Sequence, residues 1–514
     1  MTAGGATRLY LVVGSFSGDS GGRTRAAFLR AAELAPFYAS CTLLTFNHRL
    51  NYDELAQSWL DRTHAPPNVR VANFAEYLAD ELVYAAGERV VFEPGPDLVP
   101  REGKTDWERR GEGNVLEQRY VLHEDGSLNY RDEWKDGERV VHVNYDRAGN
   151  ERVWTTFWPG TRLPRTRQRF TAAGRLFADE RVAQDGETST RVIGGPADTA
   201  GEHVAVRELE YRWIASLAEP RDGGTVFMSE ARAYDGHVAV LNPHLPPGGT
   251  RTIASIHSNH LHPPYDDPQS VWTYNDWALR HAADFSRVVI LTDEQRADVE
   301  RHYGRCRTMV TVGYPVASSG ARRRLARRVR DAVHRPPVVV VVTRLVDVKR
   351  LDHALRAFAV ACTAVPAARF EIWGTGPDRD ALEGLAAELG VADRVDFPGF
   401  TDDPVATFRR GRLSVSTSQT EGFGLSMLES LTAGTPVVSY DYRYGPRDMI
   451  SDGRDGRLVR DGDVDALAAA MSDLLAHGTR ARIMGLWARR VRWTRSVRRH
   501  RRRWRALVEG TLRG

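Results

Sequence analysis

The spacing of apolar residues over the first 95 positions is that of alternating strands and helices. Short apolar runs cover residues 9–15 and 41–47, and residues 26–34 place apolar side chains at helical spacing. A glycine-rich loop lies between the first run and the helical segment. The order strand, glycine loop, helix, strand predicts a parallel sheet with crossover helices.

The pattern changes at about residue 96, where apolar and polar residues begin to alternate singly. Several alternating runs lie between residues 116 and 158, and this period of two indicates half-buried strands. Turn pairs with glycine separate the runs, at Asp125-Gly126, Asp136-Gly137, Gly149-Asn150, Ala173-Gly174 and Asp185-Gly186. We therefore expect an antiparallel meander of many strands that ends at about residue 204.

Strand and helix patterns alternate again after residue 204. A polar, arginine-rich stretch that ends in Pro336-Pro337 indicates a linker, and the run Val338–Val342 begins a second α/β unit. The predicted fold is α/β, with two Rossmann-like, doubly wound domains and an antiparallel β-meander inserted in the N-terminal one. The expected boundaries are 1–95 and 205–316 for the first domain, 96–204 for the insert, 317–336 for the basic linker, 337–485 for the second domain and 486–514 for an arginine-rich terminal helix.

The composition is that of a globular chain with several domains: 514 residues, of which 42% are hydrophobic, 27% charged and 9% aromatic. These values exclude a disordered, collagen-like or coiled-coil chain. No run approaches about 18 consecutive apolar residues, which excludes a membrane-spanning helix. The first residues lack the basic start of a signal peptide, and three scattered cysteines form no disulfide framework. A reducing cytosol is therefore expected.

Lysine is rare in this chain, and its rarity draws attention to Lys349. Only three of the 71 basic residues are lysine, and Lys349 is the only one after Lys135. Arg344 ends the valine-rich strand and Lys349 lies near the start of the next helix, at the strand end where open α/β sheets bind ligands. A guanidinium and an ammonium at that edge suit a diphosphate leaving group and need no metal. An ordinary surface charge pair is the alternative.

Two glutamates flank a glycine turn in the second α/β unit. Glu421 precedes the turn, Glu429 lies about one turn into the following helix, and Gly434 closes that helix. The amides of residues 423–425 are placed at a helix N-terminus, where they can hold anionic oxygens. The carboxylates can accept hydrogen bonds from sugar and ribose hydroxyls. The spacing of the glutamates alone fits equally a solvated helix with acidic caps.

Together with Arg344 and Lys349, the run EGFGLSMLESLTAGTPVVSYDYRYGPRDMI (421–450) closely resembles retaining glycosyltransferases of family four, which have the GT-B architecture. It is most similar to one subgroup, the wall-teichoic-acid α-glycosyltransferases, which act on poly(ribitol- or glycerol-phosphate), and the related serine-rich-adhesin O-GlcNAc transferases. Members of that subgroup carry a β-meander inserted in the N-terminal domain, like residues 96–204. The resemblance therefore extends over most of the chain.

The resemblance implies a UDP-sugar site. Arg344 and Lys349 are expected to hold the UDP diphosphate as it leaves, Glu421 to bind the donor sugar, and Glu429 to bind the ribose. The main-chain amides of Phe423, Gly424 and Leu425 are expected to bind phosphate and sugar. The loop Gly21-Gly22 is expected to approach the donor phosphate or the acceptor, because bulkier residues would block a close backbone approach. Gly374, Gly376 and Phe400 are expected near the nucleotide base. The donor is a substrate, and neither a cofactor nor a metal is expected.

Histidines gather after the strand that ends at residue 256. His257, His260 and His262 precede Asp266 and Asp267, which could be read as a metal cluster, but no H-E-x-x-H motif or cysteine ligand accompanies them. The resemblance favours a histidine beside the donor sugar, with His257 as the best match and His260 as the second. A structural role for any one of them remains open.

The last 35 residues are strongly basic. From Arg480 onward they contain 13 arginines and one acidic residue, Glu509. An apolar stripe is expected to pack the terminal helix and is formed by Trp487, Val491, Val497, Trp504 and Val508. The arginine face is expected to meet an anionic membrane surface or a polyanionic acceptor. Nucleic acid is not expected, because no nucleic-acid-binding motif accompanies the charge.

The resulting hypothesis is a cytoplasmic enzyme, peripheral at the inner face of the membrane, that transfers glucose or GlcNAc from UDP-glucose or UDP-GlcNAc to a polyol-phosphate polymer. The aromatic-rich insert is expected to bind acceptor or to form a homo-oligomer, or simply to pack its own core. Three alternatives stand beside it: a transferase acting on Ser/Thr of a secreted protein, a non-catalytic GT-B partner subunit, and a dehydrogenase. The last fits poorly, because SGDSGG departs from G-x-G-x-x-G.

Overall fold

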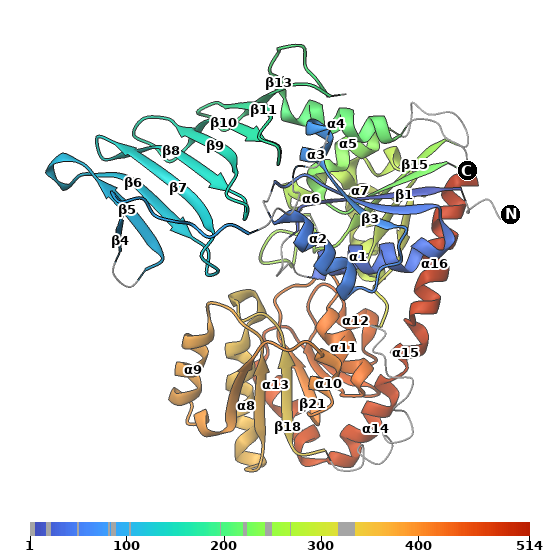
Figure 1. The fold of residues 1–514 in the computed structure, drawn as a ribbon. Helices are drawn as coiled ribbons and strands as arrows, with labels where there is room; N and C mark the ends of the chain where they lie inside the picture. Colours follow the sequence, from blue (N-terminus) through green and yellow to red (C-terminus); the bar gives the residue numbers. More distant parts are fainter. Residues whose placement is uncertain are drawn as a thin grey trace. The chain divides into compact units, whose positions relative to one another are not determined.

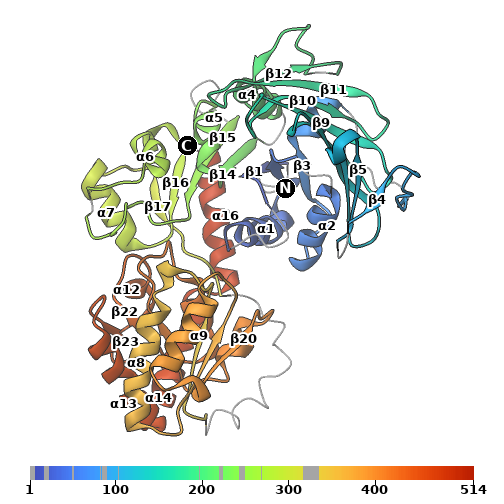
Figure 2. The same ribbon diagram turned by 90° about the vertical axis from the view of Figure 1, so that its left-hand side faces the viewer.

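The contacts within the computed structural model divide the chain into two compact units, Met1–Arg251 and Thr252–Gly514. Figures 1 and 2 show the course of the chain. The structure describes residues 6–16, 22–48, 51–80, 83, 89–101, 104–195, 197–218, 224–241, 249–267, 269–316 and 335–513. Gly21 and residues 317–334, most of the expected linker, lie outside these ranges. The six expected segments do not coincide with the two units, and their boundaries stay a prediction.

Parallel strands form the centre of the first unit. They are neighbours in the order β14-β1-β2-β3, and each pair is parallel. Leu9, Leu11 and Val12 of β1 are completely buried, as expected for a strand covered on both faces. The strands are β1 (Arg8–Gly14), β2 (Ser40–Thr45), β3 (Val69–Asn73) and β14 (Thr225–Ser229). The helices are α1 (Gly22–Leu34), α2 (Tyr52–Arg62), α3 (Phe74–Ala79), α4 (Val206–Leu217) and α5 (Asp235–Ala239).

The insert is a ten-stranded sheet in which β4 to β13 follow one another in sequence order (Figure 1). Its strands are β4 (Val99–Pro100), β5 (Asp106–Arg110), β6 (Leu116–Leu122), β7 (Leu128–Lys135), β8 (Glu138–Tyr145), β9 (Glu151–Phe157), β10 (Pro164–Phe170), β11 (Leu176–Val182), β12 (Thr188–Val192) and β13 (Val204–Ala205). Neighbouring strands are antiparallel. The glycines of all five expected turns have positive φ, so the predicted meander is confirmed.

Aromatic residues of the insert contribute to its own core. Leu128, Val143 and Tyr145 are buried together, and Tyr120 and Trp154 pack against them. This packing accounts for these three aromatic side chains without a ligand or a partner.

The second unit begins with three parallel strands, which are neighbours in the order β17-β16-β15. They are β15 (Thr250–Ile256), β16 (Arg287–Ile290) and β17 (Met309–Thr311), and the helices between them are α6 (Thr273–Arg280) and α7 (Asp293–Tyr303). The Thr292 side chain caps α7 by accepting a hydrogen bond from the Gln295 amide.

A six-stranded parallel sheet forms the rest of the second unit, in the order β20-β19-β18-β21-β22-β23. The strands are β18 (Val338–Val342), β19 (Arg369–Trp373), β20 (Val395–Gly399), β21 (Leu413–Ser416), β22 (Val437–Tyr440) and β23 (Gly456–Val459). The helices are α8 (Leu351–Ala364), α9 (Arg379–Glu388), α10 (Pro404–Phe408), α11 (Leu425–Ala433), α12 (Pro446–Met449), α13 (Val464–Ala476), α14 (Gly478–Ala488), α15 (Val491–Thr494) and α16 (Val497–Arg513). The predicted α/β class is confirmed.

The end of the chain corrects one part of the expected apolar stripe. Val491, Trp504 and Val508 are buried. Trp487 lies on the separate helix α14 and is 48% exposed, so it does not pack with them. Among the helices that the structure describes, none is long and apolar enough to cross a membrane.

Candidate functional site

The strand order of the six-stranded sheet fixes where a ligand site can form. β18 lies between β19 and β21. From β18 the chain continues through β19 to β20 at one edge of the sheet, and from β21 it continues through β22 to β23 at the other edge. Loops after two such strands diverge and leave a crevice at their carboxyl ends. Lys349 lies in the short turn Asp347–Lys349 after β18, and Glu421 lies between β21 and α11. Two residues far apart in sequence thus reach the same switch point.

Lys349 and Glu421 form an ion pair between Nζ and Oε1. Their side chains are 11% and 25% exposed, so the pair is partly shielded from water. The Ser418 hydroxyl donates to the same carboxylate oxygen at 3.1 Å, and the Thr417 hydroxyl donates to the Lys349 carbonyl at 2.8 Å. Both members are therefore held by β21 and the loop that follows it.

The main chain of Glu421 is held by a second segment of the chain. Its amide donates to the Arg443 carbonyl at 3.2 Å, and the Tyr444 amide donates to the Glu421 carbonyl at 3.0 Å. Gly422 follows, and a Cβ at this position would lie 2.1 Å from the His257 carbonyl oxygen. Only glycine allows the backbone to approach that closely. The Glu421 loop is thus fixed from both sides.

The N-terminus of α11 lies at the end of β18. Gly424 precedes the helix with φ +89°, a conformation that favours glycine, and Leu425 is its first residue. The Ser426 hydroxyl donates to the Val342 carbonyl at 2.6 Å, which joins the helix start to the end of β18. Unpaired amides at such a helix start attract anions. Glu429 lies one turn further along and is partly buried.

Phe423 is not on the crevice surface. Its side chain is 2% exposed, with the Tyr314 ring 5.3 Å away and the Arg495 guanidinium 5.1 Å from its ring centre. Its side chain is therefore closed off from a ligand, and the expected contact through its main chain stays a prediction.

Arg344 and the two expected glycines of the β19 loop are neighbours. Arg344 is exposed, and the following Leu345 amide donates to the Thr375 carbonyl at 2.9 Å. A Cβ on Gly374 would lie 1.7 Å from the Thr343 oxygen, and one on Gly376 would lie 2.0 Å from the Leu345 oxygen. The loops after β18 and β19 therefore meet through glycine backbone. Phe400, after β20, is 73% exposed.

The two expected histidines lie in different environments. His257 follows β15, is partly buried, and its Nδ1 is 2.6 Å from the Tyr314 hydroxyl. His260 is completely buried, and burial lowers the pKa of its imidazole to about 4. Its ring stacks on Tyr444 with centroids 5.8 Å apart. His257 is the more exposed of the two, whereas His260 is enclosed by the side chains packed around it.

His262 stacks on Trp272 with ring centroids 4.4 Å apart. Among the residues that the structure describes, no group of three or more His, Cys, Asp or Glu side chains could hold a metal ion. Gly22 is the first residue of α1 in the first unit. Gly21 lies outside the described ranges.

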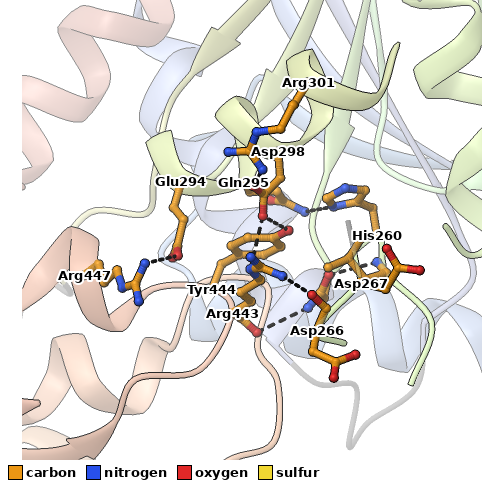
Figure 3. A network of polar contacts seen from close by, with 12 residues as sticks. His260, Asp266, Asp267, Glu294, Gln295, Asp298, Arg301, Arg443, Tyr444 and Arg447 are labelled. Carbon is orange, nitrogen blue, oxygen red and sulfur yellow. Dashed lines mark hydrogen bonds and ion pairs between the residues drawn. The ribbon is translucent and has the colours of Figure 1, made fainter. Parts of the chain in front are cut away.

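Asp298, a buried carboxylate behind the site, was not among the residues expected from sequence; Figure 3 shows its contacts. Asp298 of α7 accepts a hydrogen bond from the Tyr444 hydroxyl at 2.9 Å, and the Arg443 Nε lies 3.2 Å from the same oxygen. Arg301 donates to its other oxygen at 2.6 Å. Arg443 also donates to the Asp266 carbonyl at 2.7 Å. Asp298 thus anchors the segment that holds the Glu421 main chain.

Sequence reasoning missed this network for a physical reason. Arg443 and Tyr444 lie within the recognised run 421–450, but Asp298 is 146 positions from Tyr444 along the chain. No local pattern distinguishes Asp298 from the other acidic residues of α7. Only the packing of that helix shows its role.

Comparison with known proteins shows that this chain is similar to glycosyltransferases. Residues 323–491 match the family model described as glycosyl transferases group 1. The chain is 25% identical to the poly(glycerol-phosphate) alpha-glucosyltransferase of Bacillus subtilis over 485 residues, which cover 91% of this chain and 69% of that protein. It is 27% identical to the poly(ribitol-phosphate) alpha-N-acetylglucosaminyltransferase of Staphylococcus aureus over 506 residues, with coverages of 94% and 95%.

The fold is similar to that of a Staphylococcus aureus TarM variant solved with fondaparinux, alpha-GlcNAc-glycerol and UDP. The TM-score is 0.80 at 19% sequence identity, and the match covers 97% of this chain and 99% of that one. This likeness confirms the predicted GT-B architecture. The sequence matches confirm the expected relationship to glycosyltransferases of polyol-phosphate polymers. The roles expected for individual site residues stay predictions.

Proposed function

We propose that this chain, a glycosyltransferase related to the group 1 family, transfers glucose or GlcNAc from a UDP-sugar to hydroxyls of a polyol-phosphate polymer. The observation that carries the proposal is the Lys349–Glu421 pair at the switch point, beside the start of α11. Both relatives that span most of the chain are named for such polymers. They differ in the sugar that they transfer, so both donors remain candidates.

The crevice offers positive charge where a diphosphate would sit. Lys349 contributes an ammonium, Arg344 an exposed guanidinium, and the first amides of α11 contribute hydrogen-bond donors. As the bond between the sugar and the diphosphate breaks, negative charge grows on the phosphate oxygens. Fixed donors stabilise that charge more than they stabilise the bound donor, which lowers the barrier.

The two glutamate carboxylates recognise the hydroxyl groups of the donor. Glu421 accepts hydrogen bonds from donor-sugar hydroxyls, and Glu429, one turn into α11, accepts from the ribose. Lys349 must leave Glu421 when the diphosphate arrives, so the ion pair keeps both side chains oriented until the donor binds. His257 contacts the sugar from the side of Gly422, where the two loops meet.

We infer a reaction on one face of the sugar, with retained configuration. The acceptor hydroxyl approaches the face from which UDP departs. The bond from the anomeric carbon to the phosphate oxygen breaks, and the bond to the acceptor oxygen forms. The acceptor proton passes to the departing phosphate oxygen. The products are the glycosylated polymer and UDP, and no group of the protein is changed. The β4–β13 sheet is assigned to acceptor binding or self-association and supplies no reacting atom.

The test measures UDP release from UDP-glucose and from UDP-GlcNAc, each with poly(glycerol phosphate), poly(ribitol phosphate) or a serine-rich peptide. We expect one donor with one polyol-phosphate polymer to give release far above the rate without acceptor. UDP release that only the peptide stimulates would show that the acceptor is a protein and not a polyol-phosphate polymer. Absence of release with every pairing, despite donor binding, would contradict the proposed reaction.

A further inference from the structure

Helix α14 has apolar side chains exposed to solvent on the face opposite its packed side. The packed side is formed by Ala481, Met484, Gly485 and Ala488. Ile483 and Leu486 are each 52% exposed, and Trp487 is 48% exposed. Helical periodicity gathers these three into one ridge, which we name the α14 ridge. Arg480 and Arg482, both exposed, lie on its two flanks.

The α14 ridge cannot turn inward to bury its apolar residues. A Cβ on Gly485 would lie 2.3 Å from the Gly434 carbonyl oxygen, so the backbone of α14 packs directly on the end of α11. The ridge is therefore a fixed feature of the surface.

An arginine-lined pocket lies along one flank of the ridge. Its lining includes Arg335, Arg412, Arg482 and Arg489, and none of its described lining residues is acidic. Arg335 donates to the Gly411 carbonyl at 2.9 Å, and Arg412 donates to the Arg335 carbonyl at 2.8 Å. These bonds fix two positive groups in the wall of the pocket, and the exposed Arg482 guanidinium beside them can pair with a phosphate group.

The other flank combines an aromatic ring with positive charge. A groove there is lined by Ile483, Met484 and Trp487, together with Arg454 and Arg480. The Arg454 guanidinium lies 4.0 Å from the Trp487 ring centre. The acidic residue of this groove, Asp473, is 2.8 Å from Arg480 and is thereby neutralised.

We propose that the α14 ridge docks on an anionic phospholipid bilayer. Ile483, Leu486 and Trp487 enter the boundary between headgroups and acyl chains, and the arginine-lined pocket takes a lipid phosphate. An apolar crest with Trp, bordered by arginines, has the composition of a helix that lies in a membrane interface. The arginines beside the ridge are complementary to anionic headgroups, and we therefore favour a bilayer over an apolar protein surface as its partner. The α14 ridge contains none of the residues assigned to the transfer reaction. The membrane proposal can therefore be refuted without refuting the proposed reaction, and the reverse.

The experiment is flotation of the full chain with vesicles of phosphatidylcholine alone or with 30% phosphatidylglycerol. We expect binding to the anionic vesicles, weak binding to the neutral ones, and weakening by salt. The double variant Ile483→Glu/Leu486→Glu should lose at least tenfold in binding. Arg482→Gln should lose about fivefold, the effect of one basic residue near an anionic surface.

The matched control is Val360→Glu on α8, because Val360 is also an aliphatic helix residue and is also 52% exposed. This variant should bind as the wild type does, and all variants should keep their melting temperature. Equal binding by the double variant and the wild type would overturn the proposal, as would no binding to anionic vesicles. Capture of inorganic phosphate without vesicle binding would overturn it too. So would self-association that the double variant abolishes.

Discussion

Lys349 and Glu421 are the side chains on which the proposed chemistry depends. Truncation of Lys349 to alanine removes an ammonium from the leaving diphosphate, and we expect kcat to fall by about 10²–10³. Glu421→Ala should raise the donor KM as well, because it removes a contact to the sugar. The control is Arg212→Ala, which deletes an exposed ion pair with Glu208 and should leave kcat unchanged. Unchanged turnover in Lys349→Ala would exclude this residue from the site.

Tyr444 is expected to act on the reaction through Glu421. Tyr444→Phe removes the hydroxyl that donates to Asp298 at 2.9 Å, which loosens the segment that holds the Glu421 main chain. We expect kcat to fall about tenfold, a loss of roughly 1.4 kcal/mol, while the donor KM changes less than twofold. Tyr303→Phe, which deletes a 2.6 Å bond to Asp276, is the matched control. Both variants should melt earlier, and equal kcat losses in both would contradict a positioning role.

His260 makes stability depend on pH. Burial lowers the pKa of its imidazole from 6.5 to about 4, so the unfolded chain takes up a proton before the folded one does. The stabilisation is complete above pH 6.5 and is lost as the pH falls toward 4. From pH 7.5 to 4.5 the free energy of unfolding should fall by about 2.5 kcal/mol more in the wild type than in His260→Gln. Urea unfolding of both proteins at both pH values measures this difference. An equal loss of unfolding free energy in the wild type and in His260→Gln would refute the prediction.

At the scale of elements, the decisive contact is the close approach of the Glu421 loop to the loop after β15. Gly422→Ala would place a methyl 2.1 Å from the His257 carbonyl oxygen, so the loops must separate. We expect at least a hundredfold loss of kcat/KM with an intact circular dichroism spectrum. Gly384→Ala on α9, where no atom lies within 4 Å of the added Cβ, should raise stability by about 0.5–1 kcal/mol. Full activity in Gly422→Ala would show that the approach is dispensable.

Elements with strong local signals could be predicted from sequence, and others could not. The run Val338–Val342 became β18, and the five glycine turns separate strands of the meander. The strand Val69–Asn73 was missed because a charged residue interrupts a short apolar run. Trp487 was assigned to a packing stripe by spacing alone, but α14 and α16 are separate helices. Periodicity cannot show where one helix ends when arginines fill the surrounding positions.

At the scale of the molecule, the site depends on contacts that sequence spacing does not encode. Lys349 and Glu421 could be anticipated because each follows a recognisable strand, and strand ends bind ligands. Their direct pairing could not, since it depends on β18 and β21 being neighbours. The support from Asp298 was also hidden, because α7 precedes the recognised run by more than a hundred residues. Local patterns therefore give the reacting groups, and topology gives their arrangement.

The central claim is that the Lys349–Glu421 crevice transfers a sugar from UDP to a polyol-phosphate chain with retained configuration. The most direct measurement is a proton NMR time course of the wild type and Lys349→Ala with UDP-sugar and polymer. We predict that an α-anomeric signal on the polymer grows together with UDP in the wild type and stays at background in the variant. A β-anomeric product, or equal α-product from both proteins, would contradict the account.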